Sequence, residues 1–404
     1  MDTLARIASF ASREAISTLM QANHFLYHEG PKILLRDVVV LQNHADVLLF
    51  LQFMRAEKGT RSRYLAGLAI APPEKKEEDP MQEETAQMLT QFLITSSFDR
   101  LMTLRFEDPE AKITRYPDLL AACKTLSGIE CFTLESCDWS LYPPPFPKVR
   151  KLTISWSDYR SLSPYIHAFP NLRHLELNDT FDEDDERRPE ALAPYRQVNQ
   201  ADQCRQGSWS LDELSADVAD VYVSGLACRV GHLFLGMHNE TFEMLENVIS
   251  DICPSRLSLF VFDRVGVFDK ALGMPGVLVR SGGKELIALR LEVRISPDDR
   301  DLDIPRALEH LCASICELPL KSLILAFDCY GLPQWRGGLK MSTSSTSKPP
   351  PCCVGRYLQE VNLEMLGLRI LETVATLQEV TLSIKGHHIR EDDEVVITRP
   401  EVLQ

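Results

Sequence analysis

A hexapeptide of the form apolar-x-x-apolar-x-apolar returns along this chain at near-regular intervals, and this recurrence constrains the fold more than any other feature. Its copies begin at Leu35, Leu65, Leu101, Ile129, Val149, Leu172, Val230, Leu257, Leu286, Leu320 and Leu377. Most starts lie 20 to 36 residues apart, but the gaps after Leu172 and Leu320 are 58 and 57 residues. Repetition at this spacing predicts a stacked solenoid. Each long gap has room for one degenerate unit or an insertion.

The segments between the hexapeptides decide the architecture. Apolar residues recur at helical spacing before four of the copies, in the ranges 85–94, 117–126, 242–252 and 304–318. Because the hexapeptides have strand periodicity, strands alternate with helices, which predicts a parallel sheet inside an arc of helices. The pattern resembles that of leucine-rich-repeat proteins. The expected fold class is therefore α/β, a leucine-rich-repeat solenoid with parallel strands on the concave face and helices outside.

Composition suggests how the chain is divided. We expect a helical module at 1–36 and an irregular repeat domain at 37–404, with insertions rich in Pro, Ser or charge at about 72–82, 179–210 and 336–356. A compact acidic run, Asp182 to Glu186, lies in the second of these insertions. It is interpreted as a solvated loop, and the alternative is a contact for a basic partner.

Several functional classes are disfavoured. The net charge of −15 argues against a nucleic-acid partner, since phosphate binding needs a basic surface. The longest apolar stretch, 38–54, is interrupted by polar residues, so no membrane span is expected. No basic and apolar leader opens the chain, and the 11 cysteines are interpreted as reduced thiols of a cytoplasmic or nuclear protein. No motif for catalysis, metal or cofactor binding was found, so neither enzyme activity nor a cofactor is expected.

The N-terminal residues narrow the function. They carry a compact apolar series that consists of Leu4, Ile7, Phe10, Ile16, Leu19 and Leu26. The segment 4–36 resembles the F-box, most closely the divergent type that precedes irregular leucine-rich repeats in fungal proteins. The resemblance implies a three-helix module that docks on the Skp adaptor of cullin-RING ubiquitin ligases through these six side chains. The Leu-Pro dipeptide that opens the family's motif has no counterpart here, and Ala11 replaces an expected Leu.

Three functions compete. The resemblance implies a substrate receptor of a ubiquitin ligase of the SCF (cullin-RING) type, in which the repeats capture a substrate protein. The alternative is a leucine-rich-repeat binding scaffold without ligase function, in which the N-terminal helices only cap the first repeat. An enzyme is the third class, and the absence of catalytic motifs argues against it.

Strand alternation predicts which residues leave the concave face, because the residues between the apolar anchors point outward. In the N-terminal half these positions are polar: Thr103, Arg105, Glu107, Thr133, Lys151, Thr153, His174, Glu176 and Asn178. Farther along they become largely apolar, and the predicted partner site consists of His232, Phe234, Leu259, Val261, Arg290 and Ile324. Two alternatives remain: another segment covers this patch, or the assumed strand frame is off by one there and the residues belong to the core.

Overall fold

The structure of the protein is a computed structural model that describes residues 2–71, 81–107, 116–135, 146–155, 162–178, 188–204, 209–238, 241–261, 274–281, 283–295, 299, 302–329, 353–387 and 391–399. The chain forms two compact units, Met1–Glu183 and Asp184–Gln404. In the described residues, no helix is both long and apolar enough to cross a lipid bilayer.

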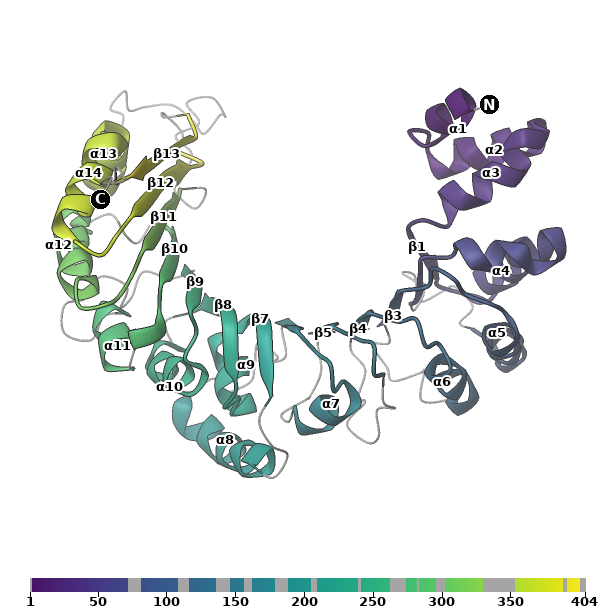
Figure 1. Ribbon diagram of the computed structural model, residues 1–404, viewed down its shortest axis with the longest axis horizontal. Helices are drawn as coiled ribbons and strands as arrows, with labels where there is room; N and C mark the ends of the chain where they lie inside the picture. Colours follow the sequence, from purple (N-terminus) through teal and green to yellow (C-terminus); the bar gives the residue numbers. More distant parts are fainter. Residues whose placement is uncertain are drawn as a thin grey trace, which may run out of the picture. The chain divides into compact units, whose positions relative to one another are not determined.

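The first unit begins with helices and continues as alternating strands and helices (Figure 1). Its elements are α1 (Asp2–Ala8), α2 (Arg13–Ala22), α3 (His24–Leu34), β1 (Val38–Leu41), α4 (His44–Arg55), η1 (Ala56–Tyr64), β2 (Gly67–Ile70), α5 (Glu83–Thr95), β3 (Thr103–Glu107), α6 (Pro117–Lys124), β4 (Cys131–Glu135), β5 (Lys151–Ser155), α7 (Ser163–Ala168) and β6 (His174–Asn178). From β1 to β6 each strand pairs in parallel with the next strand along the chain.

The second unit continues the same alternation. Its elements are α8 (Pro189–Cys204), β7 (Ser210–Asp217), α9 (Val218–Ser224), β8 (Arg229–Met237), α10 (Phe242–Ile252), β9 (Arg256–Val261), α11 (Met274–Arg280), η4 (Gly283–Glu285), β10 (Ala288–Arg294), α12 (Ile304–Ile315), β11 (Ser322–Asp328), α13 (Cys353–Glu360), α14 (Leu363–Thr373), β12 (Glu379–Lys385) and β13 (Asp393–Thr398). Strands β7 to β12 pair in parallel in sequence order, whereas β13 runs antiparallel to β12.

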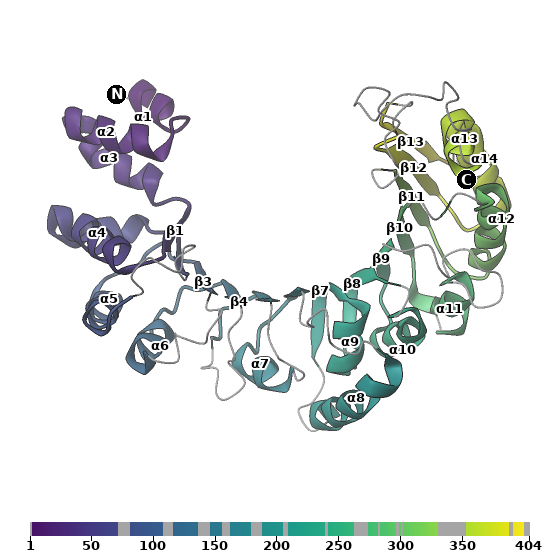
Figure 2. The same ribbon diagram turned by 180° about the vertical axis from the view of Figure 1, so that it is seen from behind.

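In each unit the helices that alternate with the strands lie on one side of the sheet, while α1 to α3 lie beyond β1 at its end (Figures 1 and 2). Side chains on that side form the core, as Leu104 and Phe106 of β3 and Phe132 and Leu134 of β4 do, and all four are buried. The opposite side, called the open face below, carries the alternate side chains of every strand. The fold is therefore α/β, of the leucine-rich-repeat solenoid type, with N-terminal helices, as predicted.

Every predicted hexapeptide overlaps or adjoins a strand, but two strands were not predicted. One is β7, which together with α8 and α9 occupies much of the first long gap in the repeat. Its buried residues are Leu211, Leu214 and Ala216, so alanine takes the third apolar position of the hexapeptide. The other is β13, which is antiparallel and lies outside the repeat. Of the segments expected as insertions, residues 72–80, 179–187, 205–208 and 336–352 lie outside the described residues, whereas α8 occupies most of the expected insertion at 179–210.

Candidate protein-interaction surfaces

The six apolar residues of the N-terminal helices divide into two groups. Ile16 and Leu26 are each 3% exposed, so they hold α2 and α3 together. The other four are exposed, and the most exposed is Phe10, at 84%. These four are Leu4, Ile7, Phe10 and Leu19. The resemblance implied that all six side chains dock on a partner, but the structure leaves only these four available, because Ile16 and Leu26 are buried between the helices.

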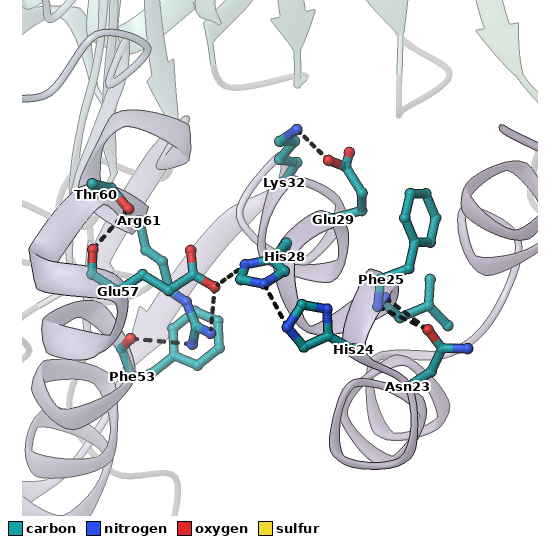
Figure 3. A network of polar contacts seen from close by, with 11 residues as sticks. Asn23, His24, Phe25, His28, Glu29, Lys32, Phe53, Glu57, Thr60 and Arg61 are labelled. Atoms are coloured by element: carbon teal, nitrogen blue, oxygen red, sulfur yellow. Dashed lines mark hydrogen bonds and ion pairs between the residues drawn. The ribbon is translucent and has the colours of Figure 1, made fainter. Parts of the chain in front are cut away.

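Local sequence explains how the three helices form. Ser12 begins α2, where its hydroxyl accepts a hydrogen bond from the amide of Ala15 at 3.3 Å. Asn23 ends α2 and begins α3, and its side-chain oxygen accepts from the amides of Phe25 and Leu26 at 2.9 and 3.2 Å (Figure 3). One asparagine therefore fixes the turn between the two helices.

A polar network connects α3 to the first repeat unit (Figure 3). Arg61 is 3% exposed, its guanidinium lies over the rings of Tyr27 and Phe53 at 4.9 and 4.4 Å, and it donates to the Phe53 carbonyl oxygen at 3.3 Å. Oε1 of Glu57 lies 3.4 Å from this guanidinium and 3.0 Å from Nδ1 of His28 on α3. Glu57 has a left-handed backbone, with φ of 53°, which is costly without a glycine. These contacts keep the strained turn in place and fasten the helices to the repeats.

The open face of the first unit is polar and largely satisfied by its own contacts. Arg105 lies 2.6 Å from both Glu107 and Glu135. Farther along, Glu176 accepts a hydrogen bond from Thr153 at 3.2 Å and lies 3.6 Å from Nζ of Lys151. The outward positions predicted on β3 to β6 are therefore confirmed, because all of them alternate with buried residues.

On the open face of the second unit, four of the six predicted partner-site residues are where the sequence placed them. His232, Phe234, Arg290 and Ile324 are half-buried and alternate with buried neighbours on β8, β10 and β11. The strand register places Ser258 of β9 between Phe234 and Arg290, and Arg290 beside Ile324. Phe234, Ser258, Arg290 and Ile324 thus form one row across four adjacent strands, and His232 precedes Phe234 on the same face of β8.

The predictions for Leu259 and Val261 were wrong. Their exposed fractions are 0% and 2%, and they lie in the core with Leu257, while Ser258 and Phe260 alternate with them toward the open face. In the segment Leu-Ser-Leu-Phe-Val-Phe, apolar residues occupy both odd and even positions. The hexapeptide pattern matches positions 257, 260 and 262, whereas the buried residues of the strand are 257, 259 and 261. A one-residue error in frame reverses every side chain of a strand.

Aromatic and basic groups meet on this face. The His232 and Phe234 rings lie 3.8 Å apart, and Nε2 of His232 is 3.0 Å from the Ser258 hydroxyl. The Arg290 guanidinium lies 5.9 Å from the Phe260 ring and 2.8 Å from Glu292, and its Nε has no hydrogen-bond partner among the described residues. Burial lowers the pKa of His232 from its ordinary value. The imidazole is therefore neutral at pH 7.

The described residues contain no group of three or more His, Cys, Asp or Glu side chains placed to hold a metal ion. Burial raises the pKa of Cys123 and of Cys228 to about 12 and that of Cys312 to about 11, so these thiols stay protonated and unreactive at neutral pH. The acidic run 182–186 lies outside the described residues. No family model and no curated protein matches the sequence.

Proposed function

We propose that this protein is a non-catalytic interaction protein that serves as the substrate receptor of an SCF-type cullin-RING ubiquitin ligase. The N-terminal helices would bind the Skp adaptor, and the open face of β8 to β11 would capture the substrate protein. The observation that carries the proposal is the exposure of Leu4, Ile7, Phe10 and Leu19 on one small helical module.

The exposure pattern supports docking because a helical cap has no need to leave large apolar side chains in water. Burying an apolar side chain contributes about 1.5–3 kcal/mol, so a module that served only its own unit would gain by folding Ile7 and Phe10 inward. Large exposed apolar side chains that gather on one module often mark an interaction site, and Leu4, Ile7 and Phe10 all belong to α1 and the turn after it. Ile16 and Leu26 already form the core that joins α2 to α3.

The chemistry of the second surface supports protein capture. Aromatic residues and arginine dominate the binding energy of protein interfaces. Phe234, Phe260 and Arg290 are of these types and lie on adjacent strands, with His232 and Ile324 beside them. A receptor of this kind supplies proximity rather than chemical groups, since it holds the substrate near an enzyme that carries ubiquitin.

A binding assay with purified Skp-type adaptor tests the first half of the proposal. Ile7→Ser with Phe10→Ser should abolish adaptor binding. The matched control, Ile94→Ser with Met102→Ser, replaces two exposed apolar residues of the same unit and should bind as the wild type does. Thermal unfolding of both variants should stay close to that of the wild type. Adaptor binding that survives the Ile7 and Phe10 changes would overturn the docking role.

The alternative function is a repeat scaffold without a ligase. The His28, Glu57 and Arg61 network favours it, because it fastens the helices to the first repeat as a terminal cap requires. Two results together would establish this alternative: wild-type protein that fails to bind the adaptor, and an Ile7→Ser and Phe10→Ser variant that unfolds at a much lower temperature.

A further inference from the structure

Strand β13 ends the sheet of the second unit with a hydrogen-bonding edge. The amide of Arg399 donates to the carbonyl of Gln378 at 2.8 Å, so the backbone groups of residues 395 and 397 also point toward β12. By the same alternation, Glu394, Val396 and Thr398 point their N–H and C=O groups away from β12. No described strand pairs with that side of β13.

The core is also incomplete at this edge. On β12 the residues under the helices, Val380, Leu382 and Ile384, are fully buried, whereas Val395 and Ile397 of β13 are only half-buried. Val396 is 57% exposed on the open face. Exposed edges are usually protected by proline, by charged side chains or by a bulge, and β13 has no proline and carries charges only at its first two residues, Asp393 and Glu394. A further strand with apolar residues would complete both faces.

We propose that a second copy of this chain pairs with β13 in antiparallel orientation, around a two-fold axis at Val396. In this register Val396 lies opposite itself and Glu394 lies opposite the partner's Thr398. The backbone N–H and C=O groups that point away from β12 then bond to the equivalent groups of the second copy, because residues 394, 396 and 398 of one strand face residues 398, 396 and 394 of the other. Val395 meets the partner's Ile397 on the helix side of the sheet. Asp393 lies opposite the partner's Arg399, whose guanidinium also donates to the carbonyl oxygen of Leu371 in its own copy.

Other symmetric registers are poorer. A shift that puts Val395 on the axis leaves Thr398 without a partner inside the strand and sets Asp393 against an apolar Ile397. A shift that puts Ile397 on the axis sets Arg399 against Val395 and leaves Glu394 unpaired. Only the register centred on Val396 pairs every outward residue and places acid opposite base.

The helix layer fits the same symmetry. Helix α14 lies over the boundary between β12 and β13, since a Cβ on Gly367 would press against Cδ1 of Ile397 on β13 and come within 3.5 Å of Cδ1 of Leu382 on β12. With strands about 4.8 Å apart, α14 and its symmetry mate lie two strand spacings, or about 10 Å, apart, a normal distance between packed helices. Arg369 pairs with Glu309 of α12 at 2.9 Å, which marks one flank of α14. Exposed Leu368 lies on the other flank, toward the second copy.

The test measures the mass of the full chain by light scattering during size-exclusion chromatography, at tens of micromolar protein. The wild type should be a dimer, while Val396→Lys and Val396→Glu should each be monomers, because each places like charges together on the axis. An equimolar mixture of the two variants should regain the dimer, since Lys then faces Glu. The control, Val198→Lys on α8, also changes an exposed valine and should remain dimeric.

Hydrogen exchange on the wild type supplies a readout that needs no variant. The amides of Glu394, Val396 and Thr398 should exchange more slowly as protein concentration rises. A monomeric wild type, a dimer that persists in Val396→Lys, a mixture that stays monomeric, or exchange that is independent of concentration would each overturn the proposal. The test involves neither adaptor nor substrate, so its outcome is independent of the proposed ligase function.

Discussion

The open faces of β3 to β6 and of β8 to β11 are built on the same strand geometry but differ in chemistry. In the first, Arg105 forms ion pairs with Glu107 and Glu135, although its Nε, like that of Arg290, has no hydrogen-bond partner among the described residues. In the second, Phe234 and Phe260 take equivalent outward positions. The repeat therefore fixes the direction of each side chain, and the outward residues alone decide whether a face is self-sufficient or suited to a partner.

Desolvation explains why the two faces suit different tasks. A partner that covered the first face would have to remove water from carboxylates and guanidinium groups that already have their ion pairs, which is costly. Covering aromatic side chains is favourable, and each buries a large apolar area. The comparison predicts that substitutions on the first face change stability and those on the second change binding.

The largest expected effect tests which side of β9 is the core. Leu259→Ala should lower the free energy of unfolding by about 3 kcal/mol, because it leaves a cavity at a fully buried site. Phe260→Ala, on the open face of the same strand, should lower it by about 1 kcal/mol or less. Urea unfolding of the two variants measures both values. Equal losses, or a larger loss for Phe260→Ala, would mean that the alternation of β9 is assigned to the wrong parity.

The next effect concerns partner capture. Phe234→Ser with Phe260→Ser should weaken binding of the captured protein by about 30-fold or more, which corresponds to about 2 kcal/mol. Thr133→Ala with Thr153→Ala is the matched control on the first face and should leave binding unchanged. Quantitative mass spectrometry of co-purified proteins identifies the ligand, and titration then gives affinities. Loss of the same ligand in the threonine variant instead would move the site to the polar face.

A smaller effect is expected at the centre of the polar face. Arg105→Met should lower the free energy of unfolding by about 1 kcal/mol or less, the usual size for partly exposed ion pairs. Burial raises the pKa of Glu107 and Arg105 opposes that rise, so the variant should raise this pKa further. A carboxyl with a raised pKa in the folded state is destabilising when ionised, so the deficit should shrink as pH falls through that pKa.

Urea unfolding at pH 7 and at lower pH, with Lys124→Met as an exposed control outside the sheet, measures this dependence. Partner binding should be the same in all three proteins. A deficit that grows toward low pH would show that Glu107 does not depend on Arg105.

Strand alternation made much of this fold predictable from sequence, and its failures have identifiable causes. On β6 polar and apolar residues alternate strictly, and the predicted frame holds. On β9 Phe260 is apolar although it faces outward, so sequence alone does not distinguish the two frames. Strand β7 was missed because Ala216 fills the third apolar position, and the antiparallel β13 does not follow the repeat at all.

The candidate surfaces were predictable only in part, for a related reason. Periodicity indicated that Ile16 and Phe10 belong to apolar helix faces, but not which of them the neighbouring helices cover. The contact of Arg61 with the rings of Tyr27 and Phe53 depends on three segments meeting in space. No short sequence pattern encodes such a contact. The left-handed backbone at Glu57 could not be predicted either, because that position is not a glycine.

The smallest expected effect compares one strand histidine from each open face. These are His174 on β6 of the first unit and His232 on β8 of the second. Burial lowers the pKa of His232 below its ordinary value of 6.5; Arg256 and Arg290 lower it too, and Glu213 raises it. A depressed pKa means that the unfolded chain binds the proton more readily, so the stability contribution is present above pH 6.5 and is lost as pH falls. A partner that covers this face removes more water from the ring and favours the neutral form further.

Affinity for the captured protein should therefore be constant above the pKa of free His232 and should fall several-fold below it. His232→Gln, whose amide can still bond Ser258, should bind without this pH dependence, while His174→Gln should keep the wild-type profile. Titrations between pH 5 and 8 measure the effect, because His is the side chain that ordinarily titrates in that range. If His174→Gln rather than His232→Gln removed the pH dependence, the ligand would be bound on the polar face of the first unit. Aromatic residues at outward positions would then not distinguish a binding face from a face whose charged groups pair with one another.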